Sequence, residues 1–258
     1  MRFAAALVVV CVIPVVAAAE EDRGYARIPG GEFATSLRYE DVRGPSRVAS
    51  FEIMRRPVTN GEFLAFVDKH RQWRRDSVAA VFADASYLLQ WPTPSRLADR
   101  TQASQPVTRV SYYAASAYCA AHGARLPLWI EWEYVAAADE TRRDARRDPR
   151  WRERILAWYA RPSSQALPRA GAQAPNVYGV QDLHGVVWEW TDDYSALLVT
   201  GDNRVQENAE RNRFCGAGAL SMDDRENYAV LMRVAMLSSL GGSDTTMNLG
   251  FRCVREVR

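Results

Sequence analysis

The sequence has only three histidines among its 258 residues, His70, His122 and His184, and no two of them stand at the spacing that places both on one face of a helix. A mononuclear iron site needs two histidines and a carboxylate, and a zinc site needs four nitrogen or sulfur ligands, so these residues alone provide neither. His122 is expected to end a helix and to cap its last carbonyl groups. His184 is expected to make a polar contact rather than bind a metal.

An excess of charge of one sign is also lacking, because 33 Lys and Arg stand against 31 Asp and Glu. A nucleic-acid-binding surface needs basic residues gathered on one face, so the composition gives no argument for nucleic acid as a partner. One group of arginines, between Arg142 and Arg154, is interleaved with acidic residues within one or two helical turns. We interpret this group as a solvated helical face or loop rather than an anion site.

Long apolar runs are absent after the first 19 residues. The run at residues 4–16 is too short to span a bilayer about 30 Å thick, and it ends in three alanines before Glu20. A basic residue, an apolar run and an Ala-x-Ala exit form the pattern of a cleaved signal peptide. The sequence predicts a signal peptide at residues 1–19, a periplasmic or secreted mature chain at residues 20–258, and no membrane contact after cleavage.

Cysteine is scarce as well, with four residues in the whole chain. Cys11 lies in the leader, and lipid modification there is the alternative to cleavage; it is less favoured because Val10 stands where a lipobox has a small residue. Removing the leader leaves Cys119, Cys215 and Cys253. Thiols pair outside the cytoplasm, so an odd number predicts one disulfide and one leftover thiol.

The apolar patterning predicts a mixed fold. Short β-prone runs separated by Gly and Pro at residues 25–53 predict strands and turns. Helices are predicted from Thr59 or Asn60 to His70, from Ser111 to Gly123, from Pro127 to Ala138, and over residues 155–159. The last third, rich in Gly, Ser, Thr and Asn, is predicted to form short strands and ordered loops. The fold class is therefore α+β with a high share of irregular structure.

Several short segments, each weak alone, follow one another in a familiar order. They are IPGGEF (28–33), PVTN (57–60), PV (106–107), AYC (117–119), GARLP (123–127), EWEY (131–134), PNVYG (175–179), HGVVWEW (184–190) and NLGFRC (248–253). As an ordered set they resemble the formylglycine-generating enzyme superfamily over nearly the whole mature chain. The resemblance implies one domain with an irregular fold related to C-type lectins.

The resemblance also implies which cysteines pair. Family members join the cysteine of the first helical motif to the cysteine that follows Gly-Phe-Arg, which corresponds here to Cys119 and Cys253. Cys215 is then the free thiol.

A structural calcium ion is implied at four positions, with Asp182 and Glu189 binding through side chains and Gly185 and Val187 through backbone carbonyls. Hard oxygen ligands suit calcium, and a bend at the glycine would let the two carboxylates converge. The alternative is that Asp182 caps a turn and Glu189 pairs with an arginine. A second calcium loop of the family would fall in residues 157–176, where carboxylates are almost lacking, and we predict that it is absent.

The cysteine pair that binds copper in the family's enzymes is missing. Counting back from Arg252 places Asp224 and Ala229 on the two copper positions, and aligning the segment at Cys215 instead supplies no second cysteine. Two thiolates suit monovalent copper because both are soft ligands. Formylglycine synthesis by the copper route is therefore not expected.

Three residues remain as catalytic candidates: Cys215, Trp188 and Asp224. Cys215 stands among small residues, and a soft copper site could add methionines, namely Met222, Met232, Met236 or Met247. The alternative for Cys215 is a small buried residue in a tight turn. Trp188 is expected at the floor of the family's cleft and Arg233 at its wall, while Arg252 is expected to anchor the C-terminal segment to a carboxylate.

The leading hypothesis is an exported metal-dependent oxidoreductase that uses copper or iron and acts on a peptide or peptide-derived substrate. Relatives without the copper cysteines include proteins of siderophore-chromophore maturation and accessory proteins of copper nitrite reductases. Function therefore does not follow from the fold alone. The alternative is a non-catalytic binding or maturation factor for a periplasmic protein partner, such as a copper enzyme.

Overall fold

The computed structural model describes residues 24–37, 44–161, 166–197 and 228–257, and the statements below concern those residues. The predicted leader, Cys215, Met222 and Asp224 lie outside them. No helix in these four ranges is long and apolar enough to cross a membrane.

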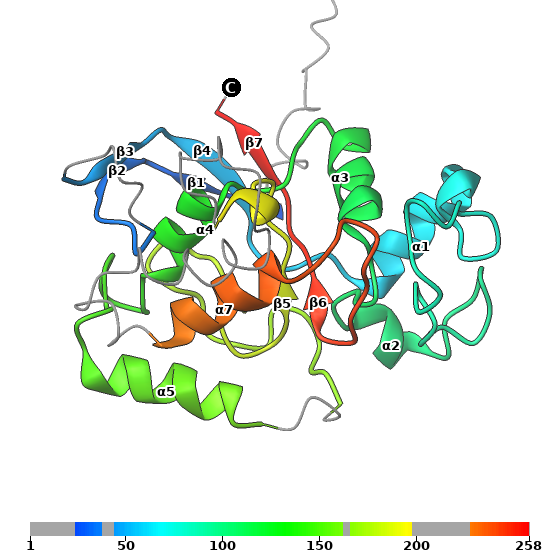
Figure 1. The fold of residues 1–258 in the computed structure, drawn as a ribbon. Helices are drawn as coiled ribbons and strands as arrows, with labels where there is room; N and C mark the ends of the chain where they lie inside the picture. Colours follow the sequence, from blue (N-terminus) through cyan, green and yellow to red (C-terminus); the bar gives the residue numbers. More distant parts are fainter. Residues whose placement is uncertain (1–23, 38–43, 162–165, 198–227, 258) are drawn as a thin grey trace, which may run out of the picture.

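The first strands form a small sheet with the end of the chain. Strands β1 (Tyr25–Ile28), β4 (Phe51–Met54) and β7 (Val254–Glu256) are antiparallel in the order β1-β4-β7 (Figure 1). Ala26 and Ile28 of β1 are buried while Arg27 between them is exposed, which is the alternation of a strand with one face on the core. A second pair joins β2 (Gly31–Phe33) to β3 (Ser46–Val48).

Two predicted helices have the boundaries that their capping residues indicate. Helix α1 (Asn60–Lys69) begins after Thr59, whose side chain accepts from the Glu62 N–H while the Glu62 carboxylate accepts from the Thr59 N–H. Helix α3 (Tyr112–Ala121) begins after Ser111. It ends at His122, whose ring lies 2.8 Å from the Tyr118 carbonyl, as the capping interpretation expects.

The third predicted helix is shorter than expected. Helix α4 (Trp129–Ala136) begins after Leu128, so Pro127 precedes the helix instead of opening it. The Glu131 carboxylate accepts from the Leu128 N–H at 2.8 Å and thereby fixes the start. Short helices α2 (Arg100–Ser104), η2 (Arg71–Trp73) and η3 (Tyr194–Ala196) complete this part of the chain.

Helix α5 (Pro149–Tyr159) extends the predicted segment 155–159 towards the N-terminus, with Asp148 as its cap and Pro149 at its first position. The prediction of only strands and loops in the last third is wrong, because helix α7 (Tyr228–Ser238) lies there. Its buried residues Val230, Val234 and Leu237 recur every three to four positions and form a helical stripe. Helices α5 and α7 contact each other (Figure 1).

The third sheet has two strands and pairs segments that are far apart in the sequence. Strand β5 (Trp188–Glu189) pairs in parallel with β6 (Leu249–Gly250), which ends at the glycine of the Gly-Phe-Arg motif. The disulfide between Cys119 and Cys253 then joins α3 to the chain just before β7, as the resemblance implies. Both cysteines are fully buried in the main core. The pairing of β5 with β6 thus fixes the HGVVWEW segment against the NLGFRC segment, and the disulfide fixes the NLGFRC segment to α3.

Candidate functional site

Two cavities lie on either side of the C-terminal end of α5. The larger has a volume of about 650 Å³ and the smaller about 340 Å³. Trp158, Arg161 and Gly185 line both cavities, so the end of α5 separates them. A volume of this size suits a small molecule or a short piece of peptide.

Aromatic side chains form the floor and one wall of the larger cavity. Trp188 is 8% exposed, and its ring centroid lies 5.6 Å from that of Trp158 and 5.1 Å from that of Tyr159. Met232 of α7 borders the same cavity and is 40% exposed. Trp188 therefore lines this cavity, and its role at the floor of the family's cleft stays a prediction. Ala229, which the gapless count from Arg252 aligns with the second copper position, stands in α7 one turn before Met232.

Below this floor lies a buried ion pair. The Glu189 carboxylate accepts from Arg252 Nε and Nη2, both at 2.8 Å, and from Trp132 Nε1 at 2.9 Å. Arg252 also donates to the Met54 and Gln181 carbonyls. The expectation that Arg252 anchors the C-terminal segment to a carboxylate is confirmed. These contacts fix β5, and with it Trp188, against the core.

A second guanidinium lies beside this pair. Arg233 of α7 is 1% exposed, stands 3.5 Å above the Trp132 ring, and donates through Nη2 to the Glu189 carbonyl at 3.0 Å. Its Nε and Nη1 have no hydrogen-bond partner among the described residues. Burial lowers the pKa of Arg233 to about 10, so it remains protonated at neutral pH. Its charge also lies 5.9 Å from the Trp188 ring.

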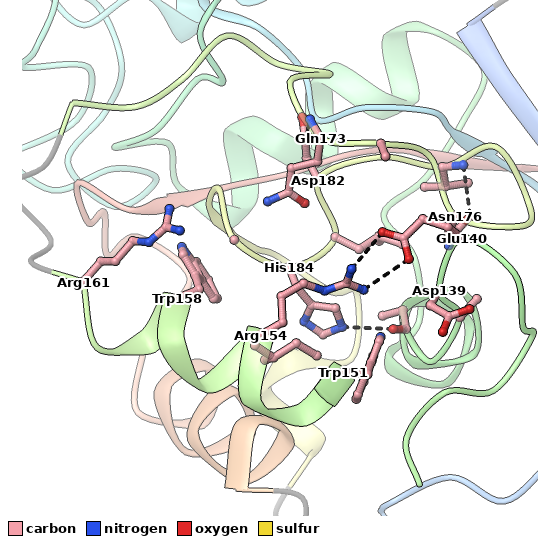
Figure 2. A pocket seen from close by; sticks show the side chains of 17 residues that line it. Asp139, Glu140, Trp151, Arg154, Trp158, Arg161, Gln173, Asn176, Asp182 and His184 are labelled. Atoms are coloured by element: carbon pink, nitrogen blue, oxygen red, sulfur yellow. Dashed lines mark hydrogen bonds and ion pairs between the residues drawn. The ribbon is translucent and has the colours of Figure 1, made fainter. Parts of the chain in front are cut away.

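The smaller cavity, shown in Figure 2, has acidic residues at one end and Trp158 and Arg161 at the other. Glu140 pairs with Arg154 at 2.8 Å, and Asp139 accepts from the backbone and side chain of Arg142. These pairs agree with the solvated interpretation of the arginine-rich segment. Burial acts to raise the pKa of Asp139, but hydrogen bonds from Arg142 and Thr141 together outweigh it and hold this pKa well below its ordinary value.

His184 borders the smaller cavity and packs edge-on against Trp132 and Trp151. Its Nε2 lies 2.9 Å from the Ala136 carbonyl, which is the polar contact expected for it. Its Nδ1 is buried and has no hydrogen-bond partner in the part of the chain described. Burial lowers the pKa of His184 to about 4, and the charge of Arg233 acts in the same direction. The ring is therefore neutral at physiological pH.

The two carboxylates of the predicted calcium site are engaged in other contacts. The Asp182 carboxylate accepts from the backbone N–H groups of Gly171 and Gln173, and Glu189 pairs with Arg252. A guanidinium already balances the charge of Glu189, so the donor set does not fit calcium as the side chains lie. Among the described residues no group of three or more His, Cys, Asp or Glu could hold a metal. Calcium at Asp182, Gly185, Val187 and Glu189 stays a prediction, and the contacts favour the alternative.

Only one of the three catalytic candidates lies among the described residues. Trp188 lines the larger cavity, whereas Cys215 and Asp224 lie outside the described residues. Of the candidate methionines, Met232 borders this cavity, Met236 is half-buried in the core, and Met247 is exposed. Sequence reasoning missed Trp158 and Tyr159 of α5 and Arg161, which follows the helix, as residues of the cavity. The signal for Trp158 and Tyr159 was the helical period shared with Trp151 and Ile155, which are the buried positions of this helix.

The irregular α+β architecture and the cavity over a WEW segment define a protein of the class that the sequence motifs suggested. Residues 14–257 match the family model for the sulfatase-modifying factor enzyme 1-like domain. The chain therefore belongs to the formylglycine-generating enzyme and sulfatase-modifying factor superfamily.

Three relatives show the range of this superfamily. The chain is 30% identical over 284 residues to the formylglycine-generating enzyme of Streptomyces coelicolor, covering 91% of this chain and 90% of that enzyme. It is 34% identical over 160 residues to the hercynine oxygenase of Mycobacterium tuberculosis, covering 56% of this chain and 38% of that protein. It is 28% identical over 277 residues to the inactive C-alpha-formylglycine-generating enzyme 2 of Mus musculus, covering 90% and 86%.

The chain thus spans well under half the length of the mycobacterial oxygenase that it matches. Among solved structures, PvdO from Pseudomonas aeruginosa is similar with a TM-score of 0.48 and 18% identity, covering 90% of this chain and 94% of that one.

Proposed function

We propose that the protein is an exported, metal-dependent oxidoreductase that acts on a peptide or peptide-derived substrate bound in the larger cavity. One observation carries the proposal. Trp188 forms the cavity floor, and Met232 in its wall stands one turn after Ala229, a copper position of the family. With the gapless count back from Arg252, this arrangement supports the cavity as the counterpart of the family's active cleft. Two relatives named as a formylglycine-generating enzyme and a hercynine oxygenase support oxidative chemistry as the reaction class.

The described side chains have separate tasks in this proposal. Trp188 and Tyr159 would hold the apolar part of the substrate and exclude water from it. The Glu189–Arg252 pair would keep Trp188 in place. A redox metal would supply the one-electron chemistry that protein side chains lack. The described residues provide only Met232 as a soft donor at the cavity, and the proposed thiol ligand is Cys215.

The first experiment measures metals in the protein purified after export, without chelators. We expect copper or iron in stoichiometric amount, lost in Cys215→Ser and retained in the matched control Ser239→Ala. Ser239 is exposed and directly follows α7. Oxygen consumption with a peptide library then tests turnover. A protein that carries neither metal and consumes no oxygen contradicts the proposal.

A second candidate is a non-catalytic binding or maturation factor with the same fold. The specific observation in its favour is Ala229, which cannot ligate a metal and which the gapless count from Arg252 aligns with a cysteine of the family's enzymes. The similarity to a mouse protein named inactive agrees with it. Capture of one periplasmic protein by the metal-free chain, without turnover, supports this candidate.

Export is tested by the N-terminus of the protein recovered outside the cytoplasm. Cleavage after Ala19 makes Glu20 the first residue. Mass spectrometry of the intact chain distinguishes this product from uncleaved protein and from a chain lipidated at Cys11.

A further inference from the structure

Charged side chains are divided unequally between the two cavities. Three carboxylates line the smaller cavity, those of Asp139, Glu140 and Asp182. No described Asp or Glu lines the larger cavity. Arg161 is the one charged residue among the described residues that line it. Counted over the described residues, the larger cavity is therefore the positive one of the two.

Arg161 is exposed, and its guanidinium makes no hydrogen bond or ion pair with any described residue. A guanidinium offers five N–H groups and no acceptor. It stands beside Trp158 at the end of the smaller cavity that lies away from Asp139 and Glu140 (Figure 2). Its charge is thus available to a ligand in the larger cavity.

The other polar side chains of the larger cavity are chiefly donors as well. The Asn248 side-chain oxygen accepts from Thr246 at 2.9 Å, which leaves the amide N–H groups to donate. The indole N–H groups of Trp158 and Trp188 can only donate. Behind the floor, the buried Arg233 adds a second positive charge 5.9 Å from the Trp188 ring. Such a lining attracts an acceptor-rich, negatively charged ligand.

We propose that the larger cavity binds a ligand in which an aromatic or apolar group is joined to a carboxylate. The apolar group packs on Trp188 and Tyr159, and the carboxylate pairs with Arg161. Arginine binds this planar anion through two parallel hydrogen bonds. The inference rests on the proposed function, because it takes the larger cavity as the substrate cavity, and it narrows the substrate to a carboxylate-bearing peptide or peptide derivative.

Arg161 also follows the C-terminal end of α5, where a cation stabilises the last carbonyl groups of a helix. Under that purely structural role, its replacement lowers the thermal stability and leaves ligand affinity unchanged. Under the recognition role, the affinity for carboxylates falls. The two roles are thus separated by one binding measurement.

The experiment uses the exported full-length product and follows tryptophan fluorescence and calorimetry with three probes. They are acetyl-Leu-Phe with a free carboxylate, its C-terminal amide, and acetyl-Asp-Phe-amide. We expect the free acid to bind at least tenfold more tightly than its amide, with an affinity that falls as salt is raised. Tight binding of acetyl-Asp-Phe-amide identifies an acidic side chain as the source of the carboxylate, and its weak binding identifies the C-terminus.

Arg161→Gln should weaken binding of the free acid by roughly tenfold or more, because a charge-assisted hydrogen bond is lost, and should leave the amide unaffected. Arg161→Lys should restore part of the affinity. Arg169→Gln is the matched control, since Arg169 is exposed and does not line the cavity. Equal affinity for all three probes, or no effect of Arg161→Gln on the carboxylate-bearing probe that binds most tightly, overturns the inference. The metal content and oxygen consumption are measured separately, so failure of the proposed function is recognised independently.

Discussion

Glu189 and Arg252 form an ion pair in which neither side chain is exposed to solvent, with Oε1 and Nη2 2.8 Å apart. The two residues are 63 positions apart in the sequence, and the pair joins β5 to the segment after β6. Arg233 lies next to the pair and bonds the Glu189 carbonyl. One buried carboxylate thus offsets part of the charge of two buried guanidinium groups.

Glu189→Gln should therefore destabilise the protein by about 3–5 kcal/mol, because it leaves Arg252 buried without its counter-charge. Urea unfolding under oxidising conditions measures the change in the free energy of unfolding. The matched control is Glu140→Gln, whose pair with Arg154 is exposed on both sides and is expected to contribute less than about 1 kcal/mol. Equal losses in the two variants contradict the role given to the buried pair.

Adding calcium gives a second test of the contacts that the Glu189 carboxylate makes. Because Arg252 already balances Glu189, and two backbone N–H groups occupy Asp182, we expect calcium to leave the melting temperature of EDTA-treated protein unchanged. A calcium site at these residues instead predicts a rise of several degrees. Such a rise, abolished in Asp182→Asn, restores the calcium interpretation, and Asp244→Asn serves as a half-buried control outside the four residues.

The disulfide is expected to be a large single contribution to stability. It links residues 134 positions apart, which corresponds to about 5 kcal/mol in the chain-entropy model. The double variant Cys119→Ala, Cys253→Ala should lose roughly 3–5 kcal/mol of unfolding free energy, whereas Cys215→Ser should lose much less. A thiol assay on the denatured mature protein should find a single reactive group before reduction, that of Cys215, and finding all of the thiols reactive at that stage contradicts the bridge.

Local chemistry explains which parts of the fold could be predicted. The start of α1 follows from Thr59 and Glu62, which contact each other within one turn, and the end of α3 follows from Gly123 with its φ of 65°. Helix α7 was missed because the composition of the last third was weighed above its helical period. The apolar positions Val230 and Val234 carry that period within the sequence itself.

The cavity could be predicted only in part, for a physical reason. Trp188 was found through the motif around it, and the arginine that anchors the C-terminal segment was expected from its motif. The wall supplied by α5 depends on how that helix packs against α7 and β5, and no short-range pattern encodes that packing. Arg161 therefore gained significance only when Trp158, Trp188 and the acidic end of the smaller cavity were seen together.

His184 gives a prediction for how the stability of the fold depends on pH. Its pKa in the folded protein is about 4, below the value of about 6.5 in an unfolded chain, because burial disfavours the charged ring. The neutral ring is thus compatible with the fold above pH 6.5, and stability is lost as the pH falls from 6.5 towards 4. Between pH 6.5 and pH 5 this group alone should cost roughly 1.5 kcal/mol.

His184→Gln isolates this contribution, because the glutamine amide can still donate to the Ala136 carbonyl but does not titrate. Urea unfolding at pH 6.5 and pH 5 gives the loss for each protein, and the wild type should lose more than the variant by about that amount. Carboxylates that titrate in this range do so in both proteins, so their effect cancels in the comparison. Equal losses show that the ring is already accessible to protons in the folded state, which would mean that the contact with Ala136 and the packing between Trp132 and Trp151 do not exclude water from it.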